Sequence, residues 1–177
     1  MKRLFSEPKL AVVWTILRIW LGAQWIEAAL SKIGNPVWTG DKAGVAISGF
    51  LGNAVKLASG EHPAVQGWYA AFIQNFALPN AKLFSYIIPF GELAVGLGLV
   101  LGCLTTLALL GGALMNLNFM LAGTTSTNPI LYTAAILLLA AGINSYRIGL
   151  DYFIFKKHFR QGKNPTWEGK GSTARVA

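Results

Sequence analysis

The feature that most constrains this chain is a set of four long apolar stretches, at about residues 10–30, 83–101, 104–122 and 130–150. Each approaches the roughly 20 residues that a helix needs to cross the hydrocarbon layer of a bilayer. Lipid offers backbone amides no hydrogen-bond partner, and the sequence lacks the alternating pattern of a membrane β-barrel, so these stretches favour helix. The sequence therefore predicts an all-α fold, an integral membrane four-helix bundle.

Composition supports a membrane environment. Of the 177 residues, 54% are hydrophobic and only 12% are charged, whereas a soluble domain carries roughly a quarter of charged residues. The net charge of +8 comes mainly from the tails, which indicates a membrane surface as partner and not a nucleic acid. The single Cys103 excludes an internal disulfide and a cysteine-built metal site, and two histidines leave little for haem. We therefore predict no metal and no haem.

Basic residues near the ends of the stretches predict the orientation. Lys2, Arg3 and Lys9 precede the first span, which exceeds the 7 to 15 or so apolar residues of a signal peptide and should be retained. Six more basic residues follow the fourth span: Lys156, Lys157, Arg160, Lys163, Lys170 and Arg175. Four spans put both tails on one side, so both termini should be cytoplasmic. This divides the chain into a membrane domain, 1–155, and a basic cytoplasmic tail, 156–177.

The long outer segment, 33–82, should contain short amphipathic helices. Apolar and aromatic residues recur at helical spacing over 64–78, and more weakly over 44–57. We expect both helices to lie on the membrane surface or to cap the bundle.

Ionisable groups inside the spans are the first candidates for chemistry, because each costs about 2.5 to 3.5 kcal/mol to insert. Counted from the cytoplasmic ends of their spans, Arg18 lies roughly 12 Å deep and Glu92 roughly 13 Å deep. The sequence thus predicts an Arg18–Glu92 pair in the bundle interior, and both are candidate catalytic residues. The alternative is an ion pair that only locks two helices together.

A second group of polar residues lies toward the outer side: Glu27 in the outer third of the first span, Lys32 and Lys82 at the outer boundary, and Asn116 and Asn118 in the outer half of the third span, followed by the polar run 123–128. They predict a vestibule that binds a small polar or anionic ligand. The alternatives are a charge that reaches lipid headgroups and asparagines that join helices, worth about 0.6 kcal/mol each.

Two further patterns have structural interpretations. Gly98 and Gly102 form a GxxxG motif, which predicts close helix packing. Arg147 and Asp151, four residues apart, predict an interfacial ion pair at the end of the fourth span.

Several motifs in order resemble the DoxX/DoxD membrane proteins, over roughly residues 18–151. Arg18, Leu21, Gly22, Trp25 and Lys32 are similar to the opening motif of that family. The runs 76–80, Pro89-Phe-Gly-Glu92, 116–123 and 126–129 resemble its DoxD-like branch.

The resemblance implies a multi-pass protein of a prokaryotic plasma membrane. For the DoxD branch it implies the membrane subunit of a thiosulfate:quinone oxidoreductase, which joins two thiosulfates into tetrathionate, passes the electrons to a quinone and requires a companion subunit, DoxA. Glu92 would then exchange protons with the quinone, Arg18 would hold that carboxylate ionised or stabilise a quinone oxygen, and Trp25 would contact the quinone.

Two other functions remain open. The aromatic outer segment could anchor redox partners to the membrane, which makes the chain a non-catalytic scaffold. Intramembrane charges could instead line the route of a small-solute transporter, although four spans are few for transport unless the protein forms a homo-oligomer.

Overall fold

The structure, a computed structural model, describes residues 7–154, and within them the chain is all-helical with no strands. A 3-10 turn, η1 (Pro8–Leu10), leads into α2 (Ala11–Leu30). The outer segment follows as α3 (Pro36–Thr39), α4 (Val45–Lys56), α5 (Gly67–Phe72) and the π-helical turn η2 (Ile73–Ala77). Then come α6 (Ala81–Leu101), α7 (Thr105–Leu121), α8 (Asn128–Ala141) and α9 (Ile143–Tyr146), and residues 150–154 are again helical.

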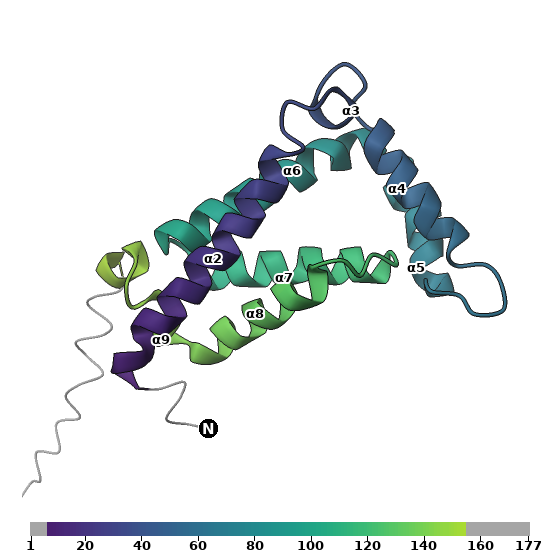
Figure 1. Ribbon diagram of the computed structural model, residues 1–177. Helices are drawn as coiled ribbons and strands as arrows, with labels where there is room; N and C mark the ends of the chain where they lie inside the picture. The colour runs from purple at the N-terminus through teal and green to yellow at the C-terminus, as the bar shows by residue number, and fades with distance from the viewer. Residues whose placement is uncertain (1–6, 155–177) are drawn as a thin grey trace, which may run out of the picture.

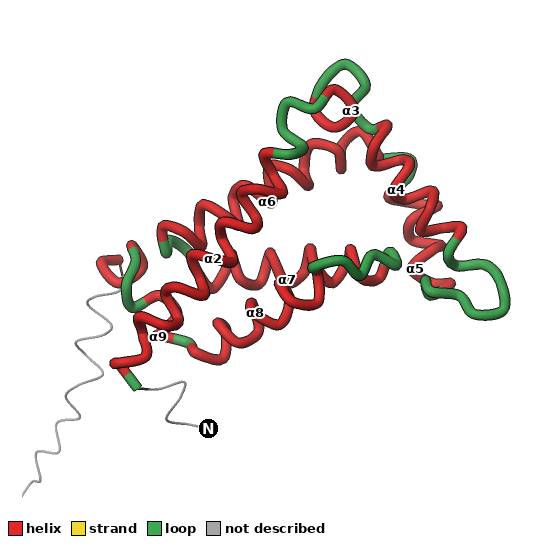
Figure 2. Tube along the Cα trace, viewed as in Figure 1, coloured by secondary structure: helices red, strands yellow, loops and turns green. Residues whose placement is uncertain are grey.

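The helices form two arms and a crosspiece. In Figure 1, α2 runs beside α6, α7 runs beside α8, and α4 with α5 lies across the open end of the V between the two arms. The arms converge near the α6–α7 turn and α9. In Figure 2, loops on either side of α3 join the far end of α2 to α4, and a separate loop at the other end of the crosspiece joins α4 to α5. The expectation of short helices in the outer segment is therefore confirmed, and they close the wide end of the arms.

The spans agree with expectation in part. Pro8–Leu30 and Ala81–Leu101 are long and apolar enough to cross a membrane, whereas α7 and α8 are shorter apolar helices. The fourth predicted span, 130–150, is too long, because α8 ends at Ala141 and Gly142 turns the chain with a φ of +52°. Residues 1–6 and 155–177, with the predicted basic tail, lie outside the described residues.

Two clusters of buried residues hold the fold together. The first joins the two arms and contains Leu21, Trp25, Leu99, Leu109 and Leu138. The second lies beneath the crosspiece and includes Ile47, Val65 and Ile73. The outward faces stay apolar: Leu107, Leu110 and Leu114 of α7 are all exposed, which a protein tolerates when lipid covers it.

The closest approach of α2 to α6 occurs at a glycine pair that the GxxxG motif did not identify. A Cβ on Gly96 would lie 2.6 Å from Ile26 Cγ1 and 2.9 Å from the Gly22 carbonyl oxygen. A Cβ on Gly22 would lie 2.9 Å from the Gly96 oxygen. Glycine is therefore required at both positions for the backbones to touch.

This crossing predicts a position-dependent effect of one substitution. Gly96→Ala should destabilise the protein by about 1 to 3 kcal/mol through overpacking. Gly91→Ala, on the same helix, should be neutral or slightly stabilising, since a Cβ there meets only Met115 at 3.7 Å. Thermal unfolding in detergent, followed by tryptophan fluorescence, measures both. Equal midpoints for the two variants would contradict the crossing.

Candidate functional site

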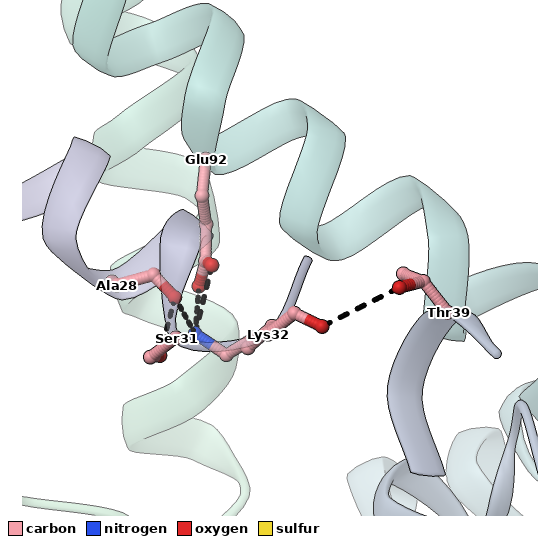
Figure 3. Close-up of polar contacts among 5 residues, drawn as sticks. All are labelled: Ala28, Ser31, Lys32, Thr39 and Glu92. Carbon is pink, nitrogen blue, oxygen red and sulfur yellow. Dashed lines mark hydrogen bonds and ion pairs between the residues drawn. The ribbon is translucent and has the colours of Figure 1, made fainter. Parts of the chain in front are cut away.

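Glu92 forms its ion pair with Lys32. Lys32 Nζ lies 2.9 Å and 2.8 Å from the two carboxylate oxygens of Glu92 and also donates to the Ala28 carbonyl oxygen at 3.0 Å. Figure 3 shows the ammonium between Glu92 and the last turn of α2. The Glu92 side chain is 2% exposed and that of Lys32 is 19% exposed. The Trp38 ring lies 5.6 Å from Nζ, within cation–π range.

The predicted Arg18–Glu92 pair is wrong. Arg18 donates from Nη1 to the Ser145 carbonyl oxygen at 3.0 Å and from Nη2 to the Ile148 carbonyl oxygen at 2.8 Å. The Gly22–Gly96 crossing places Arg18 of α2 level with the end of α6, where a Cβ on Gly102 would lie 2.5 Å from Arg18 Nη1. Glu92 lies ten residues from Gly102, about 15 Å farther along the antiparallel arm.

The predicted Arg147–Asp151 pair is also replaced by another contact. The two carboxylate oxygens of Asp151 accept hydrogen bonds from the backbone N–H groups of Leu104 and Thr105, each at 2.8 Å. The Asp151 N–H donates to the Gly102 carbonyl oxygen at 2.7 Å. Asp151 therefore caps the first turn of α7 from a distant part of the chain, and its charge also acts on Arg18.

Ser85 fixes the outer segment on α6. Its hydroxyl donates to the Trp38 carbonyl oxygen and accepts from the Gly44 N–H at 3.1 Å. Pro89 lies one turn farther along, within α6, and has no N–H to bond the Ser85 carbonyl oxygen. These contacts hold Trp38 and the start of α4 over the Lys32–Glu92 pair.

A polar cavity of about 490 Å³ lies beside this pair, between the arms and the crosspiece. Five of the predicted site residues line it: Trp25, Glu27, Lys32, Glu92 and Asn116. Its outer rim carries the exposed residues Ser31, Ser126 and Thr127, so the cavity opens at the outer end of the arms.

Asn116 is the least satisfied group in the cavity. The residue is 1% exposed, yet neither its Nδ2 nor its Oδ1 has a hydrogen-bond partner within the described part of the chain. A buried amide without protein partners costs free energy, so such a group is a candidate contact for a bound ligand or water. Asn116 therefore offers a donor and an acceptor, side by side, to whatever fills the cavity.

The other predicted site residues lie elsewhere. Lys82 is exposed at the start of α6, and Arg18 lies at the convergent end of the arms. Asn118 faces α5, where its Oδ1 accepts from the Tyr69 hydroxyl at 3.0 Å and its Nδ2 donates to the Leu114 carbonyl oxygen at 2.8 Å. Burial raises the pKa of Tyr69, which keeps this hydroxyl protonated as the donor.

Sequence reasoning missed the apolar side of the cavity. Ile47, Phe50 and Phe119 line it, and the Phe50 and Phe119 rings meet edge to face with centroids 6.3 Å apart. The helical pattern over 44–57 could have indicated that Ile47 and Phe50 share a face, but only the tertiary structure brings that face to α7.

Apolar helices with exposed apolar faces, closing around a polar cavity at one end, define a helical membrane protein. Residues 13–125, more than half of the chain, match the DoxX family, and the chain belongs to that family. No curated protein and no solved structure matches the chain.

Double-mutant cycles should separate the observed pair from the predicted one. Lys32→Met should destabilise the protein by less than the 3 to 5 kcal/mol or so that breaking a fully buried pair costs, because Lys32 is partly exposed. Adding Glu92→Gln should recover much of that loss. Arg18→Gln and Glu92→Gln should add within about 0.5 kcal/mol. Unfolding in detergent gives all these free energies, and strong Arg18–Glu92 coupling would contradict the structure.

The cap on α7 gives a second stability prediction. Asp151→Ala should cost about 1 to 2 kcal/mol, since it removes both acceptors from the first turn of α7. Asp41→Ala, at an exposed position in the outer segment, is the matched control and should change the free energy of unfolding by less than about 0.5 kcal/mol. Chemical denaturation in detergent measures the difference, and an equal effect at both positions would contradict the capping role.

Proposed function

We propose that the chain is the membrane subunit of a redox system and that the polar cavity binds the headgroup of a quinone. The observation that carries the proposal is the unpartnered amide of Asn116, buried in the same cavity as the Lys32–Glu92 pair. A quinone carbonyl can accept from Asn116 Nδ2, and a quinol hydroxyl can donate to Oδ1. The indole of the buried Trp25 supplies an aromatic wall.

The chain's own residues supply proton handling. Reduction of a quinone to a quinol takes two electrons, which the companion subunit would supply, and two protons, which the Lys32 ammonium can release through the Glu92 carboxylate that it contacts and regain from water at the cavity mouth. Lys32 holds Glu92 in position and can donate in turn, since its ammonium is partly exposed. Arg18 lies outside the cavity lining, so in this proposal it acts as a positioning residue at the convergent end of the arms.

The charges of the cavity favour a neutral headgroup over an anion. Two carboxylates, Glu27 and Glu92, and one ammonium, Lys32, line it, so an anion such as thiosulfate would meet a net negative wall. The thiosulfate donor that the family resemblance implies would then be oxidised at a companion, DoxA-like subunit: two thiosulfates join through a new S–S bond and release two electrons. We propose a plasma membrane location with both termini cytoplasmic, which puts the cavity at the outer face.

An anchoring role is the second candidate, and one observation favours it. Trp68 and Phe76 of the outer segment are 64% and 53% exposed, and Phe72 lies between them in an aromatic row. Such a row suits a partner protein or the membrane surface.

Binding of a soluble short-chain quinone to the purified protein tests the proposal. Asn116→Leu should weaken binding by about tenfold, which corresponds to one lost hydrogen bond. It should leave the unfolding midpoint unchanged or raised, because an apolar group replaces an unpaired amide of similar shape. Asn53→Leu, on the exposed face of α4, is the matched control and should preserve the affinity.

Turnover distinguishes the two candidates. With thiosulfate as donor, quinone absorbance should fall in the presence of the wild-type protein and its companion subunit, and Glu92→Gln should abolish that change in folded protein. Unaltered quinone binding in both Asn116→Leu and Glu92→Gln would overturn the headgroup site. Absence of turnover with every donor, together with a soluble redox protein that co-purifies through the aromatic row, would favour the scaffold.

A further inference from the structure

A second, apolar cavity of about 260 Å³ lies on the other side of a thin wall. Ile47, Phe50 and Phe119 line both cavities and form that wall. On α6, Gly91 lines the apolar cavity and its neighbour Glu92 lines the polar one. The two spaces therefore meet at the same level of the arms.

The apolar cavity presents no unpaired polar side chain. Tyr69 and Asn118 are the polar side chains in its lining. The Tyr69 hydroxyl donates to Asn118, whose own Nδ2 bonds to Leu114. A cavity whose polar side chains are already paired suits an apolar ligand. The unpaired amide of Asn116, in contrast, makes the neighbouring cavity polar.

The apolar cavity opens toward the lipid. Its rim includes Ile87, Leu114 and Phe72, which are 53%, 61% and 41% exposed. They belong to the outward faces of α6, α7 and α5, whereas the polar cavity opens among serines and threonines. One cavity thus communicates with the acyl region and the other with the outer aqueous side.

We propose that the two cavities form one site for an amphiphile, whose headgroup lies against Glu92 and Asn116. Its hydrocarbon chain crosses the wall of Ile47, Phe50 and Phe119 into the apolar cavity and the bilayer, which requires the Phe50 and Phe119 rings, in edge-to-face contact here, to separate. The inference rests on the proposed function for the identity of the headgroup and commits to a quinone with an isoprenoid chain. Residues of the outer segment, Ile47 and Phe50 of α4, would then determine whether a chain can be accommodated.

The hydrocarbon chain of the quinone gains little free energy by moving from lipid into this cavity, since lipid tails are as apolar as the lining. Whether the hydrocarbon chain occupies the apolar cavity is therefore tested by blocking that cavity. Gly91 suits this purpose because a Cβ there has only Met115 near it, at 3.7 Å, so a larger side chain grows into the space. Gly111 is the matched control, since a Cβ there meets Val95 at 3.6 Å and the residue lines neither cavity.

The experiment compares a methyl-substituted and a decyl-substituted quinone of identical headgroup, binding to the full chain in nanodiscs. Gly91→Leu should weaken decyl-quinone binding at least tenfold relative to the methyl analogue, whose affinity should stay within twofold of wild type. Gly111→Leu should leave the ratio unchanged. An unchanged ratio in Gly91→Leu, with both analogues still binding, would overturn the two-cavity site and leave the headgroup proposal intact. Failure of both analogues to bind wild-type protein would overturn both.

A measurement on the unaltered protein covers the case in which Gly91→Leu does not fold. A quinone with a photoreactive diazirine on its chain should label peptides of α4, α6 and α7 that line the apolar cavity, and excess decyl-quinone should suppress the labelling. Labelling confined to the lipid-facing side of α8 would overturn the proposal.

Discussion

The partly buried ion pair between Lys32 and Glu92 is the interaction on which the site depends. Burying two ions is repaid only when their geometry is good and their remaining hydrogen bonds are made. Here both carboxylate oxygens contact the ammonium, and the third contact of the ammonium is the Ala28 carbonyl oxygen at the end of α2. A cation at that end also complements the helix dipole. The pair thus fixes α2 to α6 and forms a charged but internally compensated wall of the cavity.

At the narrow end of the arms, the side chains of Arg18 and Asp151 hydrogen-bond backbone groups that have no partner within a helix. The chain leaves helix at Gly142, and the carbonyl groups of Ser145 and Ile148 beyond it need donors. Arg18 supplies them, because a planar guanidinium presents several N–H groups in fixed directions. Asp151 supplies the complementary acceptors for the start of α7. Arg18 and Glu92 therefore act at different levels of the α2–α6 arm, each with its own partners.

The sequence predicted the helices and most of the residues around the polar cavity, but it predicted the wrong partners for the charged side chains Arg18 and Glu92. Apolar length and polar depth are properties of one helix at a time, so Glu27, Lys32 and Asn116 could be assigned to the outer part of the arms, whereas Glu92 was wrongly placed level with Arg18. Which groups meet depends on the register between helices, which the Gly22–Gly96 contact sets. Depth measured from predicted span ends ignored that α2 extends past the end of α6. The end of α8 was missed because the apolar run continues through Gly142 without a polar residue.

The two asparagines of α7 show how the outer segment assigns function to otherwise equivalent residues. Asn116 and Asn118 are two residues apart, hence about 200° apart around the helix, and face opposite sides. On one side, Tyr69 of α5 donates to Asn118, so the polar side chains that line the apolar cavity are paired with each other or with the backbone. On the other side, α4 contributes only Ile47 and Phe50 to the cavity lining, and because neither side chain can form a hydrogen bond, Asn116 stays unpaired. The crosspiece therefore creates the polarity difference between the two cavities, and a ligand that crosses its wall must itself be polar at one end.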